Sequence, residues 1–144
     1  MSGRMKVPGW LCRSLLVIAV VEACGPPLTQ PSSLDISGRW ATTDAIGPLS
    51  DVEMSITQRP DGTVSGQWSG TAFPANAVCP PGLGTNPTGP VNGLNTVLEV
   101  RLSLLGAGDF DGQAIDSKTL KGSFLSCSTV YAIVFSFVGP LPPS

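Results

Sequence analysis

The chain has 144 residues, a length that favours a single domain. Only 12% of the residues are charged, whereas 42% are hydrophobic, and 17 Gly and 14 Pro interrupt the sequence. The apolar content can build a core, so the Gly and Pro residues are expected in turns between short strands. With no histidine and a net charge of −2, the composition argues against a histidine-dependent hydrolase, a histidine-ligated zinc site and a nucleic-acid binder.

The first 23 residues have the pattern of a secretory signal peptide. Three basic residues and no acid occur in residues 1–13, and the apolar run 14–21 follows. As a helix this run is about 12 Å long, too short for the roughly 30 Å of bilayer hydrocarbon. We therefore expect residues 1–23 to form a signal helix that directs export, and not a transmembrane helix.

The end of this segment resembles the lipobox of bacterial lipoproteins. Val21, Ala23 and Cys24 match that motif. The resemblance implies cleavage before Cys24, acyl chains such as palmitate on this cysteine, and a lipid anchor in the cell membrane or outer membrane. The domain would then face the periplasm or the exterior. The alternative is an ordinary secreted, soluble protein.

Residues 24–34 follow as a tether, in which three prolines in a mostly polar stretch favour an extended and solvated chain. We expect the folded domain to span 35–140, with a short tail at 141–144. An acidic mature domain gains no attraction from an anionic membrane, so attachment is expected through the acyl chains.

The remaining cysteines predict one disulfide. Cys12 leaves with the signal and Cys24 takes the lipid, so Cys79 and Cys127 remain as a pair in an oxidising compartment. In the chain-entropy model, closing a loop of about 48 residues stabilises the fold by about 4 kcal/mol. A redox-active pair usually has a much closer spacing.

Alternation of apolar and polar residues dominates the rest of the chain, most clearly at 98–104, and no stretch has a convincing helical period. Tight turns are predicted at 59–62 and 116–118. Residues 80–95 are expected to form a long irregular loop. Residues 130–138 are apolar on both faces, as in a strand that is covered on both sides. The expected strands are 36–43, 52–58, 63–69, 72–78, 96–105, 109–115, 119–126 and 130–138.

Short connections between about eight strands predict an all-β antiparallel meander that closes into a small barrel and so avoids exposed edges. An immunoglobulin-like sandwich is the rival architecture. A sandwich of that type places a core Trp between its paired cysteines, whereas Trp40 and Trp68 both precede Cys79.

Two motifs resemble the lipocalin and avidin-like barrels: the Gly-x-Trp of residues 38–40, and the hairpin 61–68. The resemblance implies a closed barrel that Trp40 plugs at one end and that binds a small, mostly apolar molecule. Small residues at Gly112 and Ala114 leave internal room for such a molecule. The candidate ligand contacts are the aromatic residues Trp40, Trp68, Phe124, Tyr131 and Phe135. The alternative is that these side chains form the core, as aromatics do in ordinary β domains.

The function expected from these features is that of an exported, lipid-anchored envelope protein whose barrel binds a small hydrophobic molecule. The alternative is a structural or interaction lipoprotein with a side-chain-filled barrel. An enzyme is not expected, and neither is a cofactor or a metal. Asp109 and Asp111 have the spacing of an acid–base pair, and with Asp116 they could offer oxygen ligands to calcium, but surface acids explain them more simply. Nothing in the sequence specifies a protein partner.

Overall fold

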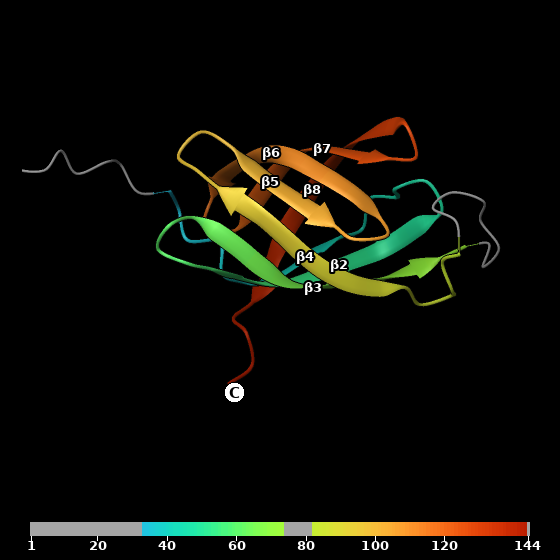
Figure 1. The fold of residues 1–144 in the computed structure, drawn as a ribbon, viewed down its shortest axis with the longest axis horizontal. Helices are drawn as coiled ribbons and strands as arrows, with labels where there is room; N and C mark the ends of the chain where they lie inside the picture. The colour runs from blue at the N-terminus through green and yellow to red at the C-terminus, as the bar shows by residue number, and fades with distance from the viewer. Residues whose placement is uncertain (1–32, 74–81, 144) are drawn as a thin grey trace, which may run out of the picture. The chain divides into compact units, whose positions relative to one another are not determined.

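The computed structural model describes residues 33–73 and 82–143, and residues 32–144 form one compact unit (Figure 1). The predicted signal peptide at 1–23, the predicted lipidation site Cys24 and the expected tether up to residue 32 lie outside the described residues, as does Cys79. Among the described residues, no helix is long and apolar enough to span a membrane.

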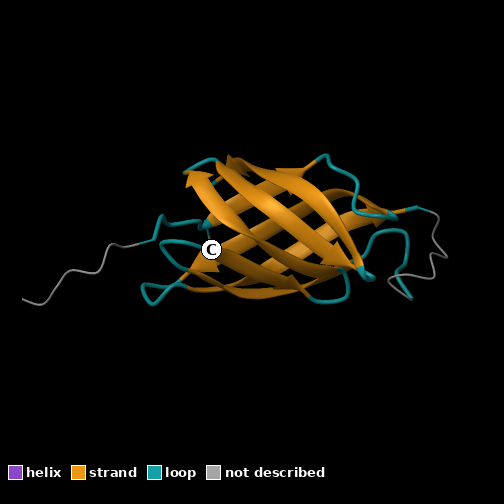
Figure 2. Ribbon diagram, turned by 90° about the horizontal axis from the view of Figure 1, so that it is seen from above, coloured by secondary structure: helices purple, strands orange, loops and turns teal. Residues whose placement is uncertain are grey.

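Eight antiparallel strands form a closed barrel in which each strand pairs with the next and the last pairs with the first. Figure 2 shows these strands crossing the barrel obliquely. The all-β meander barrel predicted from the sequence is therefore confirmed. The strands are β1 (Gly38–Thr42), β2 (Leu49–Gln58), β3 (Thr63–Ala72), β4 (Thr88–Asn95), β5 (Val100–Leu104), β6 (Gly108–Asp116), β7 (Thr119–Ser126) and β8 (Thr129–Gly139).

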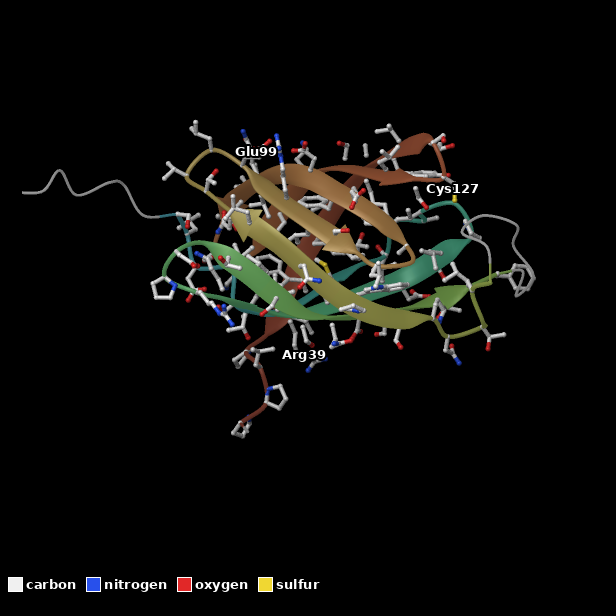
Figure 3. All side chains as sticks on the ribbon, in the orientation of Figure 1. Arg39, Glu99 and Cys127 are labelled. Carbon is white, nitrogen blue, oxygen red and sulfur yellow. The ribbon has the colours of Figure 1, made fainter. Side chains whose placement is uncertain are left out.

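The up-and-down order of the strands gives the barrel two distinct ends. We call the end with the turns 59–62, 96–99 and 117–118 the entry end, because the chain enters the barrel there ahead of β1 (Figure 1). The far end carries the 43–48 loop and the turns 105–107 and 127–128. Figure 3 shows Glu99 and Cys127 at these opposite ends.

The turn chemistry explains why the hairpins form where the sequence predicts them. At 59–62 the amide of Gly62 donates to the carbonyl of Arg59 at 2.9 Å, and Gly62 takes a positive φ of 85°. The Asp61 carboxylate accepts a hydrogen bond from the amide of Thr63 at 2.9 Å. Asp116 does the same for the amide of Lys118 at 2.7 Å. Both aspartates close Asx turns, which set the register of the strands that follow.

Three predictions for the stretch between β3 and β5 are wrong. The strand expected at 96–105 begins only at Val100, because residues 96–99 form the turn after β4. No strand begins at residue 72: β3 itself runs to Ala72 and Phe73 is a bend. The segment expected as the irregular loop 80–95 instead contains β4, which pairs along its length with β3 and β5. The sequence signal for β4 is weak because Gly89 and Gly93 occupy inward positions that would otherwise carry apolar side chains.

The core fills the inside of the barrel because every second residue of each strand points inward. In β5, Val100, Leu102 and Leu104 are buried, whereas Arg101 and Ser103 are exposed. The outer face of β8 is an exception to this alternation of apolar and polar residues. There Ile133 and Phe135 are buried, but the outward residues Val130, Val134 and Val138 are exposed. The predicted cover on both faces of this strand is thus present on its inner face only, among the described residues.

Candidate functional site

The barrel interior brings together the aromatic side chains that the sequence singled out. Trp40, Trp68, Phe124 and Phe135 are each at most 2% exposed, whereas Tyr131 is half-buried. The hydroxyl of Tyr131 lies beside Gly47 in the 43–48 loop, at the far end. Four of the five candidate residues therefore share one continuous core, and the fifth lies at its margin.

The interior is packed with side chains. A cavity large enough to hold water would leave the side chains around it accessible. Exposures of 0–2% therefore mean that no ligand-sized space adjoins these four aromatic residues. The ring of Phe110, itself 1% exposed, occupies the room that Gly112 was expected to leave, since a Cβ at Gly112 would lie 2.6 Å from Phe110 Cζ. Phe110 also meets Phe135 edge-to-face, with the ring centroids 5.6 Å apart.

Trp40 is buried beneath the chain segment that precedes β1; the plug role implied by the Gly-x-Trp resemblance stays a prediction. Its indole Nε1 donates to the carbonyl of Ile36 at 2.8 Å, and its ring meets Phe137 edge-to-face at 5.5 Å. Ile36, which belongs to that segment, is also buried. Gly38 is required here, because its φ is 143° and a side chain would collide with the ring of Phe137.

A polar cluster that the sequence did not predict lies beneath this segment. The Gln58 carbonyl oxygen Oε1 accepts hydrogen bonds from the amide of Ile36 at 3.1 Å and from Nδ2 of Asn95 at 2.8 Å. Asn95 also donates to the carbonyl of Leu34 at 2.6 Å, and Gln58 donates through Nε2 to Ser33 Oγ at 3.0 Å. These partners are 22 to 61 residues apart, so no local pattern could have indicated them.

Asn95 is only 3% exposed, yet its side-chain carbonyl oxygen Oδ1 has no hydrogen-bond donor among the described residues. Asn95 borders a depression of about 270 Å³ at the entry end, next to Leu34, Val97 and Leu98. Polar residues line this depression as well, among them Thr96, Glu99 and Gln113. The entry end therefore combines a tightly held segment with exposed aliphatic side chains.

The aspartates weighed as an acid pair or as calcium ligands lie on the outer surface. Asp111 is opposite Arg101 on the neighbouring strand, with 3.8 Å between its Oδ2 and the Arg101 Nε. Arg101 also bonds Glu99, and this hydrogen bond raises the pKa of the guanidinium above its ordinary value. No cluster of three or more metal-ligating side chains occurs within residues 33–73 and 82–143.

Of the predicted disulfide pair, only Cys127 belongs to the described residues. It forms the far-end turn with Ser128, and both residues have positive φ, as in a type I′ hairpin turn. The connection that contains Cys79 leaves the barrel after Ala72 and returns at Thr88, at this same end. The topology is thus compatible with a Cys79–Cys127 bond, which stays a prediction.

Comparisons of the chain with profiles of protein families, with curated proteins and with solved structures found no significant match. The lipobox and the lipocalin-like or avidin-like identity therefore rest on the residues alone. The class of protein that the structure defines is a small closed antiparallel barrel with a side-chain-filled interior.

Proposed function

We propose that this chain is an exported, acylated envelope lipoprotein whose barrel is a packed structural or interaction domain. The observation that carries the choice between a packed domain and a ligand container is the burial of Trp40, Trp68, Phe124 and Phe135 to 2% exposure or less. An eight-stranded barrel either fills with side chains or holds one small ligand, and the close-packed interior supports the first use.

Export and anchoring are supported by the sequence of the first 24 residues. The basic segment, the short apolar run and the match of Val21, Ala23 and Cys24 to a lipobox favour acylation of Cys24. The proposal includes no catalytic activity, because the sequence has no histidine and the surface acids Asp111 and Asp61 pair with Arg101 and close a turn, respectively. It also includes a Cys79–Cys127 disulfide at the far end.

The outer face of β8 is the surface we assign to contact with a protein partner. Val130, Ala132, Val134 and Val138 are all outward and exposed, and no charged residue follows Lys121 in the sequence. Uncharged aliphatic rows of this kind are uncommon on the outside of isolated domains and are typical of interaction sites.

A thermal-shift panel of hydrophobic metabolites tests whether the barrel is a container. A ligand at 100 times its dissociation constant would stabilise the protein by about 2.7 kcal/mol, a readily measured rise in Tm. We expect no saturable shift. A saturable shift that is weakened by Phe124→Ala, but not by the exposed-face variant Val134→Ala, would favour the ligand-binding alternative instead.

Mass analysis of the protein purified from membranes tests the anchor and the disulfide together. We expect acyl chains on a new N-terminal Cys24, and we expect this added mass to be absent in Cys24→Ser. For the disulfide, we expect the mass of the untreated protein to be lower than that of the reduced protein by two hydrogen atoms. An unmodified N-terminus at another position would refute the anchor. Two free thiols at Cys79 and Cys127 would refute the disulfide and leave the anchor unaffected.

A further inference from the structure

We infer that the entry end of the barrel rests on the lipid surface to which Cys24 is attached. The contact is made by four aliphatic side chains that we call the entry-end apolar cluster: Leu34, Val97, Leu98 and Ile115. This inference rests on the proposed acylation and adds an orientation to it.

The four side chains of the cluster are exposed at the same end of the barrel. Leu98 at the tip of the 96–99 turn is 78% exposed, and Leu34, Val97 and Ile115 are 47%, 52% and 55% exposed. Leu98 lines one surface depression with Leu34 and Val97, and a second, which also contains charged residues, with Ile115. An exposed patch of large aliphatic residues indicates a surface that is covered in use.

The covalent path of the chain brings this end to the anchor. The segment 33–37 is held against the entry end by hydrogen bonds from Trp40, Gln58 and Asn95, so the chain cannot leave the barrel elsewhere. Only eight residues, 25–32, and so nine Cα–Cα steps, separate Cys24 from Ser33. A flexible chain of that length has an r.m.s. extent of about 17 Å and a maximum of about 30 Å.

The far end is out of comparable reach. A ten-residue strand such as β2 is about 33 Å long, and at a typical barrel tilt this gives a height of about 25 Å. Turning the far end toward the lipid would require the short tether to run back along the whole barrel. The entry end therefore lies nearest to the bilayer in most orientations that the tether allows.

The charges favour the same orientation. All five basic side chains of the described residues lie in the halves of the strands, or in the turns, that are nearest to the entry end: Arg39, Arg59, Arg101, Lys118 and Lys121. Four acids share that half: Asp35, Asp61, Glu99 and Asp116. Glu53 and Asp111 lie near the middle of their strands and pair with Arg39 and Arg101 at 4.0 and 3.8 Å. The far half has no base and three acids: Asp44, Asp51 and Asp109.

An anionic lipid surface thus repels the far half of the barrel and tolerates the entry half. The net negative charge of the mature domain hides this polarity, which appears only when the residues are sorted along the barrel axis. Aliphatic residues at the tip of a turn can then enter the headgroup region, while the nearby bases face anionic headgroups.

Tryptophan quenching by brominated lipids tests the orientation. The acylated protein is reconstituted in phosphatidylethanolamine–phosphatidylglycerol vesicles, with Leu98→Trp at the entry end and Leu105→Trp as the matched far-end variant. Leu105 is also exposed, at 64%, and also borders a turn. Parent protein, in which Trp40 and Trp68 are buried, provides the background.

We expect brominated lipid to lower the added emission of the Leu98→Trp variant at least about twofold, since apolar side chains at an interface lie about 5–10 Å deep. The Leu105→Trp variant should change little. Hydrogen exchange provides a second measurement: amides 96–99 should be protected by vesicles and amides 105–107 should not.

Equal quenching of the two variants, or stronger quenching at position 105, would overturn the orientation while leaving the acylation intact. An unacylated Cys24, seen by mass before reconstitution, would overturn the proposed function and this inference with it. Quenching at position 98 that persists in Cys24→Ser would show that the cluster binds lipid without the anchor, which supports the contact itself.

Discussion

The indole N–H of Trp68 donates to the backbone carbonyl of Leu105 at 3.0 Å, although Trp68 lies on β3, Leu105 directly follows β5, and β4 runs between them. The strand between them explains the contact. Leu105 donates its amide to the carbonyl of Pro90 at 3.0 Å, and in a regular antiparallel pair residue 90 would return a hydrogen bond to the Leu105 carbonyl. Proline has no N–H, so the side chain of Trp68 supplies the missing donor.

A double-mutant cycle between Trp68 and Pro90 measures how far the indole N–H replaces the backbone N–H that proline lacks. Trp68→Phe should destabilise the protein by about 0.5–1.5 kcal/mol through loss of this partly buried hydrogen bond, plus the loss of packing. In the Pro90→Ala background the restored N–H can reach Leu105, so the same change should cost about 0.5–1.5 kcal/mol less. Urea unfolding of the four proteins gives the coupling. Strict additivity would show that the indole hydrogen bond contributes nothing.

Gly89 is the residue that lets the Trp68 indole pass. A Cβ at this position would lie 2.6 Å from the Leu105 carbonyl oxygen and 2.7 Å from Trp68 Nε1. Gly89→Ala should therefore lower the free energy of unfolding by about 1–3 kcal/mol. The control is Gly84→Ala, since nothing lies within 4 Å of a Cβ there. If both variants unfold at the same urea concentration, the close approach at Gly89 is not a real constraint.

Asp44 protects part of the edge of β8 that β1 leaves unpaired. The pairing of β1 with β8 covers only residues Arg39–Ala41, and beyond it the carboxylate of Asp44 accepts the amide of Val134 at 2.9 Å. Asp44→Ala should cost about 0.5–1.5 kcal/mol and speed hydrogen exchange at the Val134 amide. Asp44→Asn keeps an acceptor oxygen and should retain most of the protection. Unchanged exchange in the alanine variant would contradict this role.

Asp61 should make part of the stability depend on acid pH. The hydrogen bond from the backbone amide of Thr63 is the main cause that lowers the pKa of this carboxyl below its ordinary 3.8. A pKa depressed by folding means that the stabilisation is present above the unfolded-state pKa and disappears as the pH falls through the folded-state value. Asp61→Asn should unfold at lower urea than the parent at pH 7, and this gap should shrink as the pH falls below the ordinary carboxyl pKa of 3.8. A gap of the same size at pH 7 and at acid pH would show that the charge of Asp61 is irrelevant to the turn.

Alternation predicted most of the strands, because a strand with one buried face repeats every two residues regardless of its neighbours. It failed at β4, where the inward positions 89 and 93 are glycines and Pro90 lacks a donor. A strand of this composition is stable only because Trp68 and the adjacent backbones complete its packing and its hydrogen bonds. Those partners come from other parts of the chain.

The aromatic residues proposed as ligand contacts also show where local sequence patterns stop being informative. The sequence identified Trp40, Trp68, Phe124 and Phe135 as inward-facing, but it could not decide between a ligand pocket and a core. That decision depended on Phe110, whose ring fills the space beside Gly112. Whether a space is filled depends on side-chain volumes from several strands together, which no single stretch of sequence reports.

By itself, the sequence determined the all-β class, the two Asx turns that set the hairpins, and the pattern of inward and outward residues, because each of these follows from interactions among near neighbours in the chain. Only the tertiary structure decided that β4 is a strand, that the interior is packed, and that every base among the described residues gathers toward one end. Those properties arise when barrel closure brings together residues up to 61 positions apart, as Asn95 and Leu34 are.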